Sequence, residues 1–254
     1  MNLLTGLIFG TCALLTALST AICLRFAHRH RPQFRLARRA RIAASATCCV
    51  ASLLAIPQIA DAIDNAAGCN ETACHLSDLS AVVFFASLQI MIVDWTRTRP
   101  YVRTAVAVRL LLAAVVIGLL VLEFHRADTT NVDLTSEYAH NGAVTHYLVT
   151  YLAYSAIAGL EISVYSLRLA LAARRQRRAA ATGLTIAGAG GVIAVAYALS
   201  RCGYLIAAQV GHAWPLRLQD ALSPALAGLA IGCVAIGLAV ATIGYNAGPK
   251  PENG

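Results

Sequence analysis

One arginine lies inside one of the most apolar parts of the chain. The segment YALSRCGYLIAA covers residues 197–208 and contains Arg201, with Tyr197 and Tyr204 on the same helical face by their spacing of four and three residues. An ionised side chain at the centre of a bilayer costs roughly 2.5–3.5 kcal/mol, so such an arginine lies near water, pairs with an acid or has a function. A guanidinium also offers the paired donors that carboxylates and phosphates accept. Arg201 is therefore a candidate for a structural clamp between helices or for a site that binds a small anionic ligand.

The position of Arg201 along its helix limits the acids that it can meet. It lies about 10 Å from the end of the expected helix at Ala208, on the side that we expect to face outward. Acids expected at this depth are Asp220, Glu123 and Asp78. Asp220 follows the shortest connection, so the sequence predicts an Arg201–Asp220 pair.

A second group of charged residues is expected near the other end of the helices. Glu161 lies about 10 Å from the helix end at Arg168, and Arg109 lies about 8 Å from the same side of the membrane. Their matching depth predicts an Arg109–Glu161 ion pair, and Asp94 is a candidate to join them.

Long apolar helices are the elements that position these residues. The chain has 254 residues, of which 58% are hydrophobic and 13% are charged, and its mean hydropathy is +0.66. Soluble domains carry about 25% charged residues, and a spanning helix needs about 20 apolar residues. The apolar runs are continuous, which excludes the alternating pattern of membrane strands. The sequence predicts an all-α polytopic membrane protein, a seven-helix transmembrane domain over residues 1–245 with spans at about 3–24, 42–60, 76–95, 104–124, 144–167, 182–208 and 221–245.

The distribution of arginine predicts the orientation. The loops 25–41, 96–103 and 168–181 carry most of the arginines, whereas the intervening loops hold most of the acids. Positively charged loops remain in the cytosol, so we expect a multi-pass protein of the cell (cytoplasmic) membrane with its N-terminus outside and its C-terminus in the cytosol. The first apolar segment has no preceding cation, which argues against a cleaved signal peptide. Residues 246–254 are polar and are expected to form a disordered cytosolic tail.

The net charge of +8 bears on the partners of the protein. Arginine-rich cytosolic loops predict contact with the anionic headgroups of the lipid bilayer rather than with nucleic acid, and a cytosolic protein partner is an alternative. We find no HExxH motif, phosphate-binding loop or nucleophile elbow, so the sequence predicts neither an enzyme nor a cofactor. The only lysine is Lys250, which leaves no amine in the spans for a retinal Schiff base.

Two cysteines share an expected outer loop. Cys69 and Cys74, in GCNETACH, are five residues apart, and an oxidising exterior permits a disulfide between them. Two free thiols, or a metal contact with His75, are the alternatives. The histidine spacing matches no metal motif, so no metal site is predicted and His75 is expected to be a solvated loop residue.

Small residues recur at four-residue intervals in the last two expected spans. Gly183, Ala187 and Gly191 form one such series, and Gly228 and Gly232 form another. Small residues allow helix backbones to approach closely, so we expect tight packing within the bundle rather than a dimer interface.

Three segments carry a family resemblance: LVTYLAYSAIAGLEI, YALSRCGYLIA and WPLRLQDALSPALAGL. With the seven-span layout, they resemble actinobacterial seven-helix integral membrane proteins that are catalogued as transporters although their function is not established. The resemblance implies Arg201, Tyr204, Ser223 and Pro224 as matching positions, without assigning them a chemistry. Longer members continue into a cytosolic C-terminal region, whereas this sequence stops at Gly254.

These observations predict a membrane transporter or permease-like protein of unknown substrate. The alternative is a membrane-embedded sensor or receptor, or an anchor for a cytosolic regulatory protein. Transport needs a polar path that reaches Glu161 and Arg201 from opposite sides, whereas a receptor needs only an outer site and a cytosolic contact surface.

Overall fold

The computed structural model describes residues 2–25, 35–96, 99–127, 134 and 141–247. These residues form eight α-helices and no strand, which confirms the all-α class. The helices are α1 (Asn2–Arg25), α2 (Arg35–Leu54), α3 (Pro57–Ala67), α4 (Thr72–Thr96), α5 (Arg99–Arg126), α6 (Gly142–Ala173), α7 (Arg178–Gln209) and α8 (Leu216–Ala247).

Length and hydropathy identify the chain as a multi-pass membrane protein. Within the described residues, six helices are long and apolar enough to cross a membrane, and the count becomes seven if α2 and α3 together form one bent span. Large aliphatic side chains also point outward from the bundle: Leu111 is 66% exposed, Ile157 61% and Leu199 64%. Such a surface suits lipid, because a soluble protein rarely exposes contiguous apolar surface of this extent.

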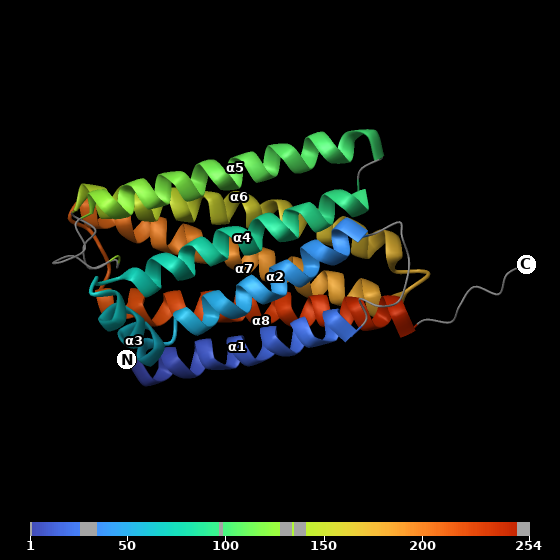
Figure 1. Ribbon diagram of the computed structural model, residues 1–254, viewed down its shortest axis with the longest axis horizontal. Coiled ribbons are helices and arrows are strands. Elements are labelled where there is room, and N and C mark those ends of the chain that lie inside the picture. Colours follow the sequence, from blue (N-terminus) through green and yellow to red (C-terminus); the bar gives the residue numbers. More distant parts are fainter. Residues whose placement is uncertain (1, 26–34, 97–98, 128–133, 135–140, 248–254) are drawn as a thin grey trace, which may run out of the picture.

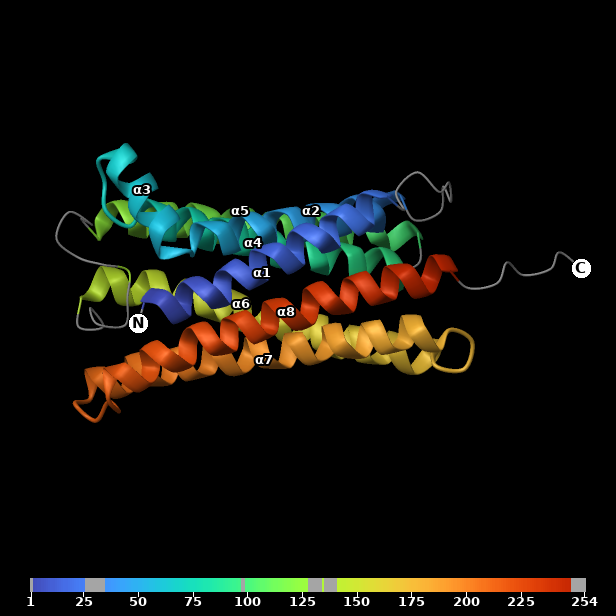
Figure 2. The same cartoon turned by 90° about the horizontal axis from the view of Figure 1, so that it is seen from below.

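The second expected span, residues 42–60, is not one continuous helix in the structure. Helix α2 ends at Leu54, and α3 starts at Pro57 after a bend of 82°. Proline has no backbone N–H to continue the helix, and it favours an extended conformation in the residue before it; Ile56 has φ −78° and ψ 121°. Helix α3 therefore turns away from the bundle at the end where the chain begins (Figure 2).

The bundle has two chemically different ends. One end, here called the arginine-rich end, contains the end of α1, the start of α2 and the α6–α7 turn, together with the C-terminal end of α8 (Figure 1). The opposite end contains α3, the start of α6 and the α7–α8 turn. Helix α8 continues to Ala247, so the first two residues of the expected tail are helical, and residues 248–254 lie outside the described part.

Small residues bring α7 into close contact with both of its neighbours. A Cβ on Gly183 would lie 2.3 Å from the backbone nitrogen of Ala241 in α8, and a Cβ on Gly191 would lie 2.7 Å from the carbonyl oxygen of Gly159 in α6. Neither position has room for a side chain. The expected tight packing within the bundle is thus confirmed on both faces of α7.

Candidate functional site

Arg201 lies on α7 near the opposite end of the bundle. Its Nη1 donates a hydrogen bond of 2.9 Å to the hydroxyl of Tyr197, one turn earlier, and its guanidinium carbon lies 5.9 Å from the centroid of the same ring. Its Nε is buried and has no hydrogen-bond partner among the described residues. The guanidinium is thus held from one side and keeps a donor in a region away from solvent.

The expected Arg201–Asp220 ion pair is wrong. Arg201 forms no ion pair within 4.0 Å in the described part of the chain, whereas Arg109 pairs with Glu161 and Arg126 with Glu123.

The rotation of α8 explains this difference. Consecutive helical residues point about 100° apart. Gln219, the residue before Asp220, takes the inward direction and is fully buried, accepting a hydrogen bond of 3.1 Å from Trp214 Nε1 and donating one of 2.8 Å to Ser223. Asp220, next to it, is half-buried; its charge acts on Arg201, but no ion pair forms within 4.0 Å.

Asp78, on α4, is a second acid in this region. It interacts electrostatically with Arg201, although no ion pair forms within 4.0 Å. Its Oδ2 accepts a hydrogen bond of 3.0 Å from the hydroxyl of Tyr147, which lies 3.1 Å from the His75 Nδ1. A tyrosine has one hydroxyl proton, so while Tyr147 donates to Asp78, the imidazole is the donor to Tyr147. We call His75, Asp78, Tyr147, Tyr197 and Arg201 the Arg201 cluster.

His75 differs from the solvated loop histidine that we expected. Helix α4 begins at Thr72, three residues earlier than His75, so the imidazole is carried into the bundle. It is 7% exposed and stacks on Phe124 with ring centroids 4.2 Å apart. An aromatic contact and a hydrogen bond to Tyr147 replace the water that a loop histidine would have.

A second cluster lies toward the arginine-rich end. Arg109 Nη2 and Glu161 form an ion pair, as their matching depth predicts. The other carboxylate oxygen of Glu161 accepts a hydrogen bond of 2.6 Å from Gln89, and Gln89 accepts one of 3.3 Å from the Tyr154 hydroxyl. We call Gln89, Arg109, Tyr154 and Glu161 the Glu161 cluster. Both oxygens of the acid are used, so this cluster has the form of a structural network, although Arg109 Nε is buried without a hydrogen-bond partner among the described residues.

Two other predicted site residues, Asp94 and Tyr204, contact neighbouring segments rather than the charged residues of the two clusters. The carboxylate of Asp94 accepts a hydrogen bond of 2.9 Å from the backbone nitrogen of Ala37 in the first turn of α2, a favourable place for an acid, rather than one from Arg109. Tyr204 is buried and packs edge to face against Trp214, with centroids 5.4 Å apart. Neither residue contacts a charged member of the two clusters through a hydrogen bond.

The two cysteines of the expected outer loop are both free thiols in the structure. Cys69 is exposed between α3 and α4, whereas Cys74 belongs to α4 and is partly buried. The disulfide therefore stays a prediction about the oxidised protein. Within the part of the chain that the structure describes, no three His, Cys, Asp or Glu side chains are grouped to hold a metal ion.

A small cavity adjoins the Arg201 cluster and extends to Leu88 and Ile162, the sequence neighbours of Gln89 and Glu161. Its volume is about 80 Å³, and its walls are mainly apolar side chains of α2, α4, α6, α7 and α8, including Phe84, Phe85 and Leu88. Tyr151, Ser155 and Tyr197 are polar residues of its lining, and Tyr197 is the residue that holds Arg201. The cavity thus adjoins the Arg201 cluster in the interior of the bundle.

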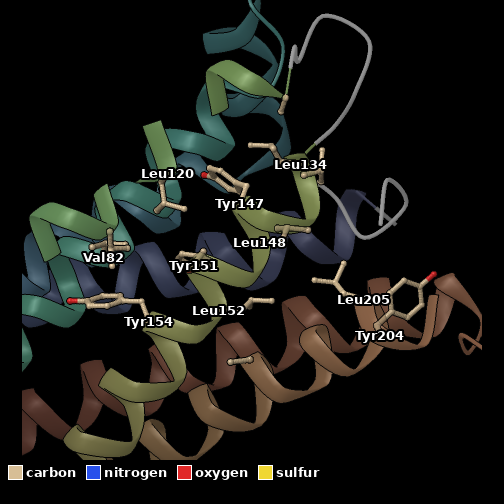
Figure 3. Packing of buried hydrophobic residues seen from close by; sticks show 14 of the residues in the cluster. Val82, Leu120, Leu134, Tyr147, Leu148, Tyr151, Leu152, Tyr154, Tyr204 and Leu205 are labelled. Carbon is tan, nitrogen blue, oxygen red and sulfur yellow. The ribbon is translucent and has the colours of Figure 1, made fainter. Parts of the chain in front are cut away.

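The spacing of the tyrosines on α6 is a sequence signal for residues that were not among the predicted site residues. Tyr147, Tyr151, Tyr154, Ala158 and Glu161 follow intervals of four and three residues, which place them on one helical face. Figure 3 shows the three tyrosines along the same stretch of the helix, and all three are buried. This stripe ends at an acid and could have indicated that both clusters meet the same face of α6.

Comparison with known proteins identifies no relative: no family model, no curated protein and no solved structure matches the chain.

Proposed function

We propose that this multi-pass membrane protein is a transporter or permease-like protein of the cell membrane that recognises a small anion through Arg201. The proposal includes membership of the actinobacterial family that the three sequence segments resemble. It also includes seven spans, with α2 and α3 as one bent span, an outer N-terminus and a cytosolic C-terminus. The concentration of arginine at one end of the bundle supports this orientation.

The observation that carries the proposal is the incompletely bonded guanidinium of Arg201. A buried donor without an acceptor costs roughly 1–3 kcal/mol, and an oxygen of a bound anion would remove that cost. Arg109 also has a buried Nε without a partner, but it is paired with Glu161, whereas Arg201 has no ion pair within 4.0 Å and keeps its Nε donor for a ligand. Ionisable residues within spans mark substrate or ion paths, and arginine suits carboxylates and phosphates because of its forked geometry.

The polar face of α6 supports transport rather than binding alone. Tyr147 contacts the Arg201 cluster and Glu161 the other cluster, and the two lie about 21 Å apart along the helix at 1.5 Å per residue. The cavity of about 80 Å³ lies along this path and adjoins Tyr151. Polar groups at two depths on one face, with space between them, are the elements that a substrate path requires.

Uptake into liposomes tests the proposal. Purified protein is reconstituted, and radiolabelled acetate, benzoate and inorganic phosphate serve as probes. We expect at least one probe to accumulate, with uptake lost in Arg201→Gln and reduced about tenfold in Arg201→Lys, which keeps the charge but not the fork. Arg126→Gln is the matched control because that arginine is exposed. Uptake that is the same with Arg201→Gln as with the natural protein would reject Arg201 as the anion-binding group.

The native cysteine Cys69 allows a test of the orientation. It is exposed, whereas every other cysteine of the described structure is buried or partly buried. A membrane-impermeant maleimide should label Cys69 in intact cells, and Cys69→Ser should abolish that labelling. A cysteine introduced as Arg175→Cys should react only after permeabilisation. Labelling of Arg175→Cys in intact cells, with protection of Cys69, would reverse the orientation.

The size of the central cavity favours a second candidate function, a membrane-embedded sensor. About 80 Å³ accommodates several water molecules but is well below the roughly 300–1,000 Å³ of common ligand pockets. A sensor needs the anion only at Arg201, where binding would shift the packing of α7 against α6 and α8. An anion that raises the thermal stability of the protein in an Arg201-dependent manner, without any uptake, would favour the sensor.

A further inference from the structure

A second cavity lies at the arginine-rich end of the bundle. Its volume is about 260 Å³, whereas that of the central cavity is about 80 Å³. This value approaches the lower end of the range for ligand pockets, about 300 Å³. Side chains of α2, α4, α6, α7 and α8 and of the α6–α7 turn line it, and none of them belongs to the Arg201 or Glu161 cluster. It is therefore a separate site.

Two arginines from distant parts of the sequence meet at this cavity. Arg41 comes from α2 and Arg177 immediately precedes α7. Arg41 Nη1 donates a hydrogen bond of 2.8 Å to Thr242 of α8, which orients the guanidinium. Two guanidiniums at one cavity give its wall positive charge and the forked donors that phosphate oxygens accept.

The surrounding backbone adds to the positive potential. The first turns of α2 and α7 contain no acid, and each contributes a lining residue, Ala37 and Ala180. Helix N-termini carry a partial positive charge. Asp94 precedes the lining residue Trp95, and its carboxylate accepts the backbone N–H of Ala37. One oxygen of this acid is thus bound by the N-terminal end of α2.

The other walls of the cavity are apolar. Leu169 of α6, Leu184 of α7 and Ala241 of α8 line it, and Trp95 of α4 completes the set. Tryptophan is common at the boundary between headgroups and hydrocarbon. A ligand that fills this cavity must therefore present an anionic head to the arginines and an apolar part to the helices.

We propose that this cavity binds the phosphate headgroup of an anionic phospholipid from the surrounding leaflet. Arg41 and Arg177 would donate to the phosphate oxygens, and the glycerol and upper acyl segments would contact Leu169 and Leu184. Basic pockets between membrane helices suit such headgroups, because they combine charge with access from the bilayer. Its lining residues come from the start of α2, the ends of α4 and α6 and the α6–α7 turn, which lie at the arginine-rich end of the bundle. In the proposed orientation this end meets the cytosolic headgroups. This site is independent of transport and of the anion site at Arg201.

Native mass spectrometry of the purified full chain in an uncharged detergent tests this proposal. Phosphatidylglycerol and phosphatidylcholine with identical acyl chains are titrated separately. We expect phosphatidylglycerol to bind at least about tenfold more tightly, and Arg177→Gln to weaken its binding about tenfold, because a hydrogen bond between charged groups is roughly twice as strong as a neutral one. Arg41→Gln with Arg177→Gln should remove the preference for phosphatidylglycerol. If the double variant fails to fold, the binding of phosphatidylglycerol to Arg177→Gln alone tests the proposal.

Two comparisons separate this site from less specific explanations. Arg174→Gln with Arg175→Gln removes two exposed cations near Arg177 and should leave the preference unchanged. An equal loss in that control would show attraction to the surface charge and overturn the site. Inorganic phosphate should compete weakly, and full displacement of the lipid by millimolar phosphate would assign the cavity to a free anion instead. Equal binding of the two lipids would overturn the proposal altogether.

Discussion

Glu161→Gln separates the electrostatic role of the Glu161 cluster from its packing. The substitution keeps the size of the side chain and an oxygen that can accept from Gln89, but it leaves Arg109 without its acid. The Arg109 and Glu161 side chains are only 17% and 18% exposed. Breaking a buried pair by removing one partner costs about 3–5 kcal/mol, because the remaining charge is uncompensated. The remaining exposure and the length of arginine place the expected loss near the lower limit, about 3 kcal/mol, or more than a hundredfold in the unfolding equilibrium.

The free energy of unfolding is measured by titrating SDS into mixed micelles and following helix content by circular dichroism. Arg126→Gln is the matched control: it breaks the other ion pair, Glu123–Arg126, whose arginine is 61% exposed. Exposed pairs contribute about 0.2–1 kcal/mol, so the control should change stability by less than about 1 kcal/mol. The swapped variant, Arg109→Glu with Glu161→Arg, should recover part of the loss, because opposite charges again face each other.

The comparison of Glu161→Gln with Arg126→Gln tests whether the buried ion pair stabilises the bundle. If Glu161→Gln and Arg126→Gln change stability equally, both members of the buried pair already reach water, and the pair does not stabilise the bundle. A swapped variant that is no better than Glu161→Gln would show that the arrangement depends on Gln89 and Tyr154 rather than on charge.

Two further substitutions test the Arg201 cluster and the helix packing. Tyr147→Phe removes the hydroxyl between Asp78 and the imidazole and should cost about 1–3 kcal/mol in the same SDS titration, whereas Tyr101→Phe, at a 67% exposed position, should have no measurable effect. Gly183→Ala should lower stability by about 1–3 kcal/mol or more, since its Cβ would lie 2.3 Å from the α8 backbone. Gly118→Ala, where no atom lies within 4 Å of the added Cβ, should be neutral or raise stability slightly. Similar effects of the two substitutions would contradict the observed packing.

The depth of a residue along a membrane helix could be predicted from the sequence. Each residue advances a helix by a fixed 1.5 Å, and the apolar run defines where the helix begins and ends. This is why the amino-acid sequence is sufficient to pair Arg109 with Glu161. The same regularity predicts the small-residue contacts of Gly183 and Gly191. It fails at residues 42–60, where Pro57 ends one helix and starts another within an apolar run.

The direction of a side chain around its helix, and the neighbour that it then meets, depended on tertiary structure. Asp220 has the right depth for Arg201, but the rotation of α8 turns Gln219 inward instead. Asp78 and Tyr147, far apart in sequence, meet because α4 and α6 pack together. The apolar pattern sets the length and depth of each helix because hydrocarbon selects for it, whereas rotation and partners are set by how all the helices pack at once. The sequence alone therefore determined that a multi-pass α-helical membrane protein forms, and only the packed bundle decided which charges, tyrosines and cavities adjoin.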